Sequence, residues 1–149
     1  MTRPLPNVLF LCTGNSCRSQ MAEGWARALR AGDFVSCSAG TSPHGLNPLA
    51  VRVMAEAGVD ISTHASKTPA QALESGRIDL VVTVCDHAAE SCPRVPELAG
   101  VPAFHAPFDD PPRLARDARS EEEALAHYRR VRDEIASFIR TLNAPLLPR

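Results

Sequence analysis

The sequence predicts an α/β fold in which an open, parallel, four-stranded sheet carries helices on both faces. Two observations predict it: short apolar runs of strand length alternate with segments whose apolar residues recur at steps of three and four. Such alternation forms right-handed β-α-β units, so each strand lies parallel to the one before it. The chain has 149 residues and no internal repeat, so we expect a single domain spanning residues 1–149.

The four predicted strands are short and mostly apolar. Residues 7–12 (Asn-Val-Leu-Phe-Leu-Cys) form the first run, which is typical of a parallel strand buried on both faces. The others are predicted at residues 34–38, 78–84 and 101–106. In sheets of this kind, ligands bind at the carboxyl ends of the strands, near the point where the strand order reverses.

Three segments carry a helical pattern. Residues 17–30 place apolar side chains at steps of three and four, and Asn47-Pro48 opens a second pattern that stops at Gly58. The third helix is predicted over residues 121–142, with one apolar face made of Leu125, Tyr128, Val131, Ile135, Phe138 and Ile139.

The composition argues against several classes of partner. A net charge of -1 provides no basic field for nucleic acid. No apolar run approaches the roughly 18 residues of a membrane span, and the first residues do not resemble a signal peptide. We therefore expect a cytoplasmic monomer with no nucleic-acid or membrane partner. Five cysteines, an odd number, argue against a framework of permanent disulfides.

The segment between the first strand and the first helix predicts an oxyanion site. A loop that passes from a strand end into a helix points backbone N–H groups inward, beside the positive end of the helix dipole. Gly14 and Asn15 tolerate the unusual dihedrals of such a loop, and the Arg18 guanidinium matches two oxygens of a tetrahedral anion. The predicted oxyanion-binding residues are Thr13, Gly14, Asn15, Ser16, Cys17, Arg18 and Ser19.

Cys12, which precedes this loop, is the candidate nucleophile. The positive environment is expected to lower the pKa of its thiol and so to favour the reactive thiolate. The segment is not a nucleotide-binding Walker loop, because no Gly-Lys-Ser/Thr ends it. The alternative is a simple strand-to-helix turn whose cysteine only packs. A cysteine, five residues and an arginine directly after a buried strand favour the anion site.

Residues 8–24 (VLFLCTGNSCRSQMAEG) resemble the signature of thioredoxin-coupled arsenate reductases, which share the fold of low-molecular-weight protein tyrosine phosphatases. The resemblance continues through residues 38–40, 60–62, 79–85 and 108–111, and so covers nearly the whole chain. It implies a low-molecular-weight phosphatase-like fold and the reduction of arsenate to arsenite in arsenic detoxification. It also implies thioredoxin as electron donor, no bound cofactor, and phosphate or sulfate as mimics of the substrate.

A phosphatase needs only the loop cysteine and a general acid, but this chain also has Cys85 and Cys92. Cys12 and Cys85 both end predicted strands, so their side chains can meet over one edge of the sheet. A helix from Cys85 to Cys92 would separate their Cα atoms by roughly 10 Å, whereas a disulfide tolerates about 4.4–6.8 Å. Such a bridge would require residues 86–91 to unwind. Two alternatives to a redox role remain. Cys85 could be a thiol of the core, or it could bind zinc together with His87 and Cys92.

The resemblance implies a relay of three thiols. Cys12 attacks arsenate, Cys85 attacks Cys12 and releases arsenite, and Cys92 attacks Cys85 to leave a bridge for thioredoxin to reduce. Cys17 is assigned to the anion loop and Cys37 to the core.

The resemblance also implies a general acid, Asp110, which directly precedes Pro111; Asp109 is the second candidate. The phosphatases typically follow this Asp-Pro pair with aromatic residues that grip a phosphotyrosine. Here Pro112 and Arg113 follow, which favours the reductase. A phosphatase for phosphotyrosine or a small phosphoester is the alternative function, and a redox-sensing module without turnover is a third.

Several reductases of the family hold a potassium ion with Asn, Glu, Ser and Asp. Asn15, Glu23 and Ser38 match three of these positions, but Lys67 occupies the place of the Asp. Because an ammonium group can take the place of the cation, we expect no metal site.

Overall fold

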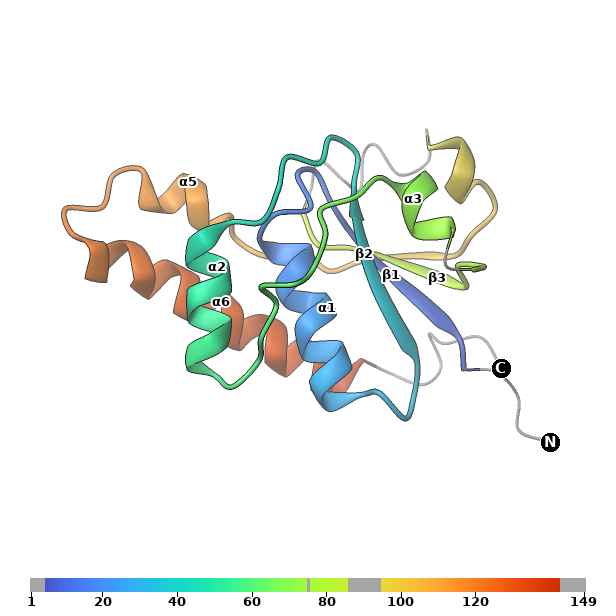
Figure 1. Ribbon diagram of the computed structural model, residues 1–149, viewed down its shortest axis with the longest axis horizontal. Helices are drawn as coiled ribbons and strands as arrows, with labels where there is room; N and C mark the ends of the chain where they lie inside the picture. Colours follow the sequence, from blue (N-terminus) through green and yellow to red (C-terminus); the bar gives the residue numbers. More distant parts are fainter. Residues whose placement is uncertain (1–4, 75, 86–94, 143–149) are drawn as a thin grey trace.

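The computed structural model describes residues 5–74, 76–85 and 95–142, and it confirms the predicted architecture (Figure 1). Four parallel strands form one sheet in the order β2-β1-β3-β4. They are β1 (Asn7–Cys12), β2 (Val35–Gly40), β3 (Leu80–Thr83) and β4 (Ala103–His105). The strand order reverses between β1 and β3, so the carboxyl ends of these two strands mark the expected ligand site.

β1 lies inside the sheet, paired with β2 along one edge and with β3 along the other, and helices cover both faces of the sheet. The side chains of residues 8–11 are fully buried, which accounts for the continuous apolar run. β2 extends further than predicted, because its last residue, Gly40, still pairs with Cys12. A Cβ atom at Gly40 would lie 2.5 Å from the Thr13 carbonyl oxygen, so only glycine lets β2 approach the loop this closely.

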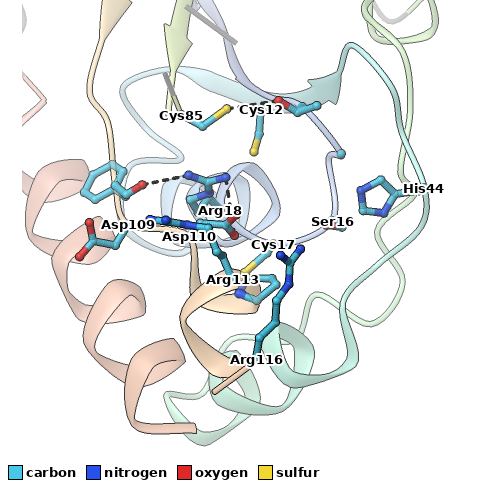
Figure 2. Close-up of a pocket in the computed structure, with 14 residues that line it drawn as sticks. Cys12, Ser16, Cys17, Arg18, His44, Cys85, Asp109, Asp110, Arg113 and Arg116 are labelled. Atoms are coloured by element: carbon cyan, nitrogen blue, oxygen red, sulfur yellow. Dashed lines mark hydrogen bonds and ion pairs between the residues drawn. The ribbon is translucent and has the colours of Figure 1, made fainter. Parts of the chain in front are cut away.

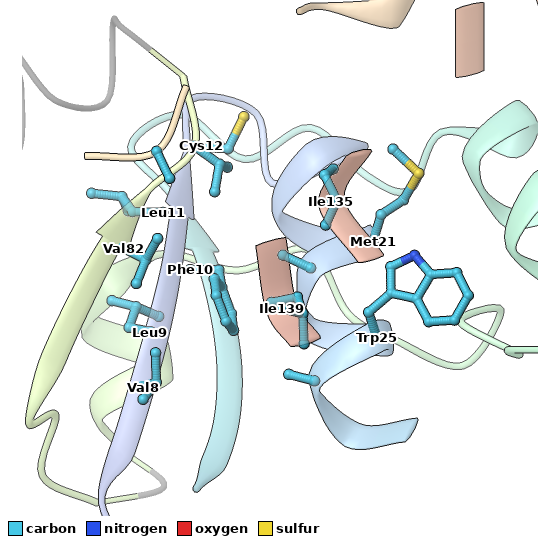
Figure 3. Close-up of a cluster of buried hydrophobic side chains, with 14 of the residues drawn as sticks. Val8, Leu9, Phe10, Leu11, Cys12, Met21, Trp25, Val82, Ile135 and Ile139 are labelled. Atoms are coloured by element: carbon cyan, nitrogen blue, oxygen red, sulfur yellow. The ribbon is translucent and has the colours of Figure 1, made fainter. Parts of the chain in front are cut away.

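The three predicted helices are present, with slightly shorter bounds. They are α1 (Arg18–Leu29), α2 (Pro48–Glu56) and α6 (Glu121–Thr141). Gly58, with φ of 85°, follows α2 as predicted. α6 packs its apolar stripe against α1 and α2, and side chains such as Ile135 and Ile139 join Phe10 and Met21 in the core (Figure 3).

Three short helical segments were not predicted. They are α3 (Pro69–Leu73), the 3₁₀ helix η2 (Pro96–Leu98) and α5 (Pro111–Ala115). Each begins at a proline, which is common at the first position of a helix, and each is too short to show a helical period. α3 lies on the opposite side of the sheet from α1, α2, α5 and α6, so the sheet has helices on both faces (Figure 1).

None of the helices in residues 5–74, 76–85 and 95–142 is long and apolar enough to cross a membrane.

Candidate active site

A cavity of about 670 Å³ opens at the carboxyl edge of β1 and β3 (Figure 2). Its walls come from the loop after β1, from Cys85 after β3, from residues 108–116 around α5, and from His44. All predicted loop residues line it except Asn15 and Ser19, which are fully buried behind it. The structure therefore brings Cys12, Cys85 and Asp110 into one cavity, as the candidate site requires.

The loop is held in shape from behind by Asn15. Its φ of 47° is the only positive value at a non-glycine residue in the described part of the chain. The Asn15 amide donates to the Ser19 hydroxyl at 2.9 Å and accepts from the Lys67 backbone N–H at 2.8 Å. The Gln20 amide donates to the Asn15 carbonyl oxygen at 3.1 Å. These contacts offset the cost of a left-handed residue and fix the loop before any ligand binds.

Glycine is needed at position 14 for a different reason from the one predicted. It does not adopt a positive φ, so the prediction that it supplies an unusual dihedral is wrong. A Cβ atom at Gly14 would lie 2.1 Å from Nε2 of His44. Glycine is therefore required for space, because the His44 ring packs directly on the loop.

The thiols of Cys12 and Cys85 lie side by side in the cavity wall (Figure 2). The Cys85 thiol and burial raise the pKa of the Cys12 thiol, whereas Arg18 and the Thr13 backbone N–H lower it. The raising effects are larger, so the prediction of a lowered pKa is wrong for this arrangement. The physical reason is the neighbouring thiol, which competes with Cys12 for a single negative charge.

Cys85 follows β3 and is buried, with 3% of its surface exposed. The Thr13 hydroxyl lies 3.6 Å from its sulfur, so Cys85 contacts the anion loop itself. Cys92 and His87 lie outside the described residues, as do residues 86–91. The bridge from Cys85 to Cys92 and the alternative zinc site therefore stay predictions.

The Arg18 guanidinium lies in the cavity near Cys12 and is held by two groups. One guanidinium nitrogen donates to the Phe108 carbonyl oxygen at 2.9 Å, and another lies 3.7 Å from the Asp110 carboxylate. The Phe108 ring packs edge-on against Phe138 of α6, at 5.8 Å between centroids. The long C-terminal helix thus positions the segment that orients Arg18.

The two candidate acids differ in their surroundings. Asp110 faces Arg18 and its side chain is 36% exposed, whereas Asp109 pairs with Arg130 at 3.0 Å and is 60% exposed. Asp110 thus contacts the group expected to bind the oxyanion, and Asp109 is drawn toward α6. The geometry favours Asp110 as the proton donor to the leaving oxygen.

We expect Asp110→Asn to lower kcat by about 10²–10⁴-fold, because the amide cannot donate the proton that the leaving oxygen needs. Binding of phosphate should change little, because the loop and Arg18 remain. Steady-state kinetics and phosphate titrations of this variant and of Asp109→Asn check the assignment. A larger loss of kcat in Asp109→Asn would reverse the roles of the two residues.

The remaining described cysteines are not placed for exchange with Cys85. The Cys17 side chain lies in the cavity wall away from Cys85 (Figure 2), and burial raises the pKa of its thiol to about 12. Cys37 packs against the core, and its thiol donates to the Val8 carbonyl oxygen at 3.6 Å.

Glu23 forms a buried ionic cluster beneath the loop, with only 2% of its side chain exposed. One carboxylate oxygen accepts from the Ser38 hydroxyl at 2.7 Å and lies 3.5 Å from the Lys67 ammonium. The other pairs with Arg27 at 2.8 Å and lies 3.5 Å from His64, whose pKa burial lowers. Two fixed cations thus compensate the buried carboxylate, which agrees with the proposal that an ammonium takes the place of potassium.

Exchanging sodium chloride for potassium chloride at equal ionic strength should therefore leave the arsenate-dependent rate and the melting temperature unchanged, within about 1 °C. Thermal unfolding and the coupled rate assay measure both quantities. A potassium-specific rise of several degrees would mean that the Lys67 ammonium does not fill the cation position.

Five residues of the cavity wall were not predicted as site residues from the sequence: His44, Phe108, Pro112, Arg113 and Arg116. His44 and Arg116 are examples. His44 follows β2 and reaches the loop only because β2 pairs with β1. Arg116 lies just after α5, a helix that was not predicted. Neither residue carries a local signal that could have identified it.

Comparison with known proteins places this geometry in a family. The chain matches low molecular weight phosphotyrosine protein phosphatase over residues 7–147. An arsenate reductase of Halalkalibacterium halodurans is 48% identical over 134 residues, which cover 90% of this chain and 92% of that protein.

Solved structures agree. An arsenate reductase in the phosphate binding state has a TM-score of 0.69 at 29% identity and covers 95% of this chain and 99% of its own. A low molecular weight protein tyrosine phosphatase from T. tengcongensis has a TM-score of 0.72 at 27% identity, covering 92% and 97%. These findings confirm the resemblance inferred from the sequence. The chain is an enzyme that belongs to the low molecular weight phosphotyrosine protein phosphatase family.

Proposed function

We propose that the protein reduces arsenate to arsenite through a relay of Cys12, Cys85 and Cys92, and that thioredoxin regenerates it. The observation that carries the proposal is a second thiol, that of Cys85, beside the Cys12 thiol inside an oxyanion cavity. Hydrolysis of an ester needs only the nucleophilic thiol, whereas reduction by thiol exchange needs a second thiol beside it. The relative named arsenate reductase supports the same activity.

In the first step, the backbone of the loop and the Arg18 guanidinium bind arsenate, and the Cys12 sulfur attacks the arsenic atom. An arsenic–sulfur bond forms and an arsenic–oxygen bond breaks. Asp110, beside Arg18, gives a proton to the departing hydroxyl, which leaves as water, and the proton that the Cys12 thiol loses restores Asp110. This step needs no lowered thiol pKa beforehand, because the thiol gives up its proton to Asp110 within the step.

In the second step, the Cys85 thiolate attacks the Cys12 sulfur. The arsenic–sulfur bond breaks, arsenic keeps its electron pair, and arsenite leaves as a Cys12–Cys85 disulfide forms. Arsenic is thereby reduced by two electrons and the two thiols are oxidised. The positions of the two thiols, side by side at the ends of the neighbouring strands β1 and β3, support this step.

In the third step, Cys92 attacks Cys85 and restores the Cys12 thiol, leaving a Cys85–Cys92 disulfide for thioredoxin to reduce. Reduced thioredoxin acts in reducing compartments, so we propose that the protein works in the cytoplasm, as a monomer. No cofactor takes part in the three exchanges as written.

The experiment that tests the function follows arsenate-dependent oxidation of NADPH in the presence of thioredoxin and thioredoxin reductase. We expect multiple turnovers that stop when either thioredoxin or arsenate is left out. Absence of turnover in the complete mixture, with hydrolysis of an aryl phosphate intact, would contradict the proposal.

The second candidate is a phosphatase for phosphotyrosine or a small phosphoester. The family match favours it, as does the fact that Cys12, Arg18 and Asp110 alone would suffice for ester hydrolysis. Its hydrolysis of an aryl phosphate would be indifferent to replacement of Cys85, whereas arsenate reduction would stop. Comparison of the two reactions in Cys85→Ser separates the candidates.

A further inference from the structure

The cavity is larger than a single tetrahedral anion requires. Its volume of about 670 Å³ lies within the range of roughly 300–1,000 Å³ that is usual for pockets that hold drug-sized molecules. The oxyanion loop and Arg18 account for the deep end, next to Cys12 (Figure 2). The outer part has space for the rest of a larger ligand, and its walls indicate the chemistry of that ligand.

Two arginines line this outer part, Arg113 in α5 and Arg116 directly after it. The spacing of three residues in a helical turn places both on one side of the segment. Pro111, on the same short helix, is buried, so the segment has a fixed orientation toward the core. In Figure 2 the Arg116 side chain extends from α5 toward Ser16 of the loop.

Neither guanidinium has a carboxylate or hydrogen-bond partner within the described part of the chain. The two carboxylates in the cavity wall have cations of their own, since Asp110 faces Arg18 and Asp109 pairs with Arg130. Arg113 and Arg116 therefore add positive charge to the mouth, and neither forms an ion pair with a carboxylate of the described residues. Such guanidinium groups favour carboxylate and phosphate groups, which accept two parallel hydrogen bonds from one fork.

We propose that Arg113 and Arg116 form a second anionic subsite at the mouth of the cavity. The site would then bind small phosphomonoesters with a second negative charge, a carboxylate or a second phosphate, more tightly than esters without one. The inference rests on the oxyanion binding in the proposed function and adds the ligand class that the outer cavity selects. It also explains the absence of aromatic residues after Asp110-Pro111, because an arginine wall selects for charge and not for an aryl ring.

A matched pair of ligands tests the subsite. 3-Phosphoglycerate and glycerol 3-phosphate share a phosphomonoester and a three-carbon skeleton, but only the first carries a carboxylate. We expect the protein to bind 3-phosphoglycerate about tenfold more tightly, a difference typical of a charge-assisted contact. Dissociation constants are measured by NMR titration of the reduced protein, with inorganic phosphate as the probe of the loop alone.

The double variant Arg113→Ala/Arg116→Ala should lose this preference while its affinity for glycerol 3-phosphate changes less than about threefold. Arg119→Ala is the matched control, because this exposed arginine removes the same charge but does not line the cavity. The control should keep the preference, and melting temperatures should show that all variants fold.

Equal affinity of the wild type for the two esters would overturn the subsite, as would loss of the preference in Arg119→Ala, which would indicate a general positive field. Inorganic phosphate separates this failure from that of the proposed function. If phosphate binds but the esters do not differ, only the subsite is wrong. If phosphate does not bind at all, the oxyanion loop is misassigned and both proposals fail.

Discussion

Cys12→Ser is expected to reduce arsenate turnover and aryl phosphate hydrolysis to the rate of the mixture without enzyme. Cys12 is the nucleophile in both reactions, and a serine hydroxyl can neither replace a thiol nucleophile at neutral pH nor form a disulfide with Cys85. The coupled NADPH assay and an aryl phosphate assay measure the two losses. Phosphate should still bind, because the loop backbone and Arg18 are unchanged.

Cys37→Ser is the matched control, because this thiol packs against the core and lies outside the cavity. It should keep nearly the full rate of both reactions. Arsenate turnover by Cys12→Ser comparable with that of Cys37→Ser would remove the central role of Cys12.

Arg18→Lys should lower kcat/KM for arsenate by about 10²–10³-fold, the loss typical of removing one donor from an oxyanion site. The planar guanidinium can face Asp110, donate to the Phe108 carbonyl oxygen and present N–H groups to the anion at the same time. A lysine ammonium is a point charge without this fork, so it cannot make these contacts together.

Arg119→Lys provides the matched control, because this exposed arginine does not line the cavity and should tolerate the same exchange. Phosphate titrations show how much of the Arg18→Lys loss lies in binding. Near-normal kinetics in Arg18→Lys would mean that the anion binds elsewhere in the cavity.

The sheet and the anion loop could be predicted from the sequence because their signals are local. β1 is an apolar run followed at once by turn-forming residues, and α1 carries a clear helical period. α3 and α5 were missed because a helix of five residues has no period to detect. β2 was predicted to end at Ser38, whereas pairing with β1 carries it to Gly40.

The parts of the candidate site that lie directly at strand ends could be predicted from the sequence. Cys12 and Cys85 meet because β1 and β3 are neighbours, which two buried strands ending in cysteine already suggested. The direction of the pKa shift of Cys12 was predicted wrongly, because the prediction considered the positive loop and Arg18 but not the opposing effects of the Cys85 thiol and of burial. The need for glycine at Gly14 likewise depends on a distant side chain, that of His44.

The relay as a whole depends on Cys92, which lies outside the described residues. Without this thiol the third exchange cannot occur, and the proposed chemistry must stop at the Cys12–Cys85 disulfide. Cys92→Ser should therefore complete one round and release one arsenite per enzyme. The wild type, given one equivalent of arsenate without thioredoxin, should instead accumulate the Cys85–Cys92 disulfide.

Peptide mapping of Cys92→Ser by mass spectrometry, after one equivalent of arsenate and alkylation of the free thiols, tests the relay most directly. The account predicts a peptide pair joined through Cys12 and Cys85, in a yield equal to the arsenite released. Sustained turnover of Cys92→Ser with thioredoxin, and no such bridge, would contradict it.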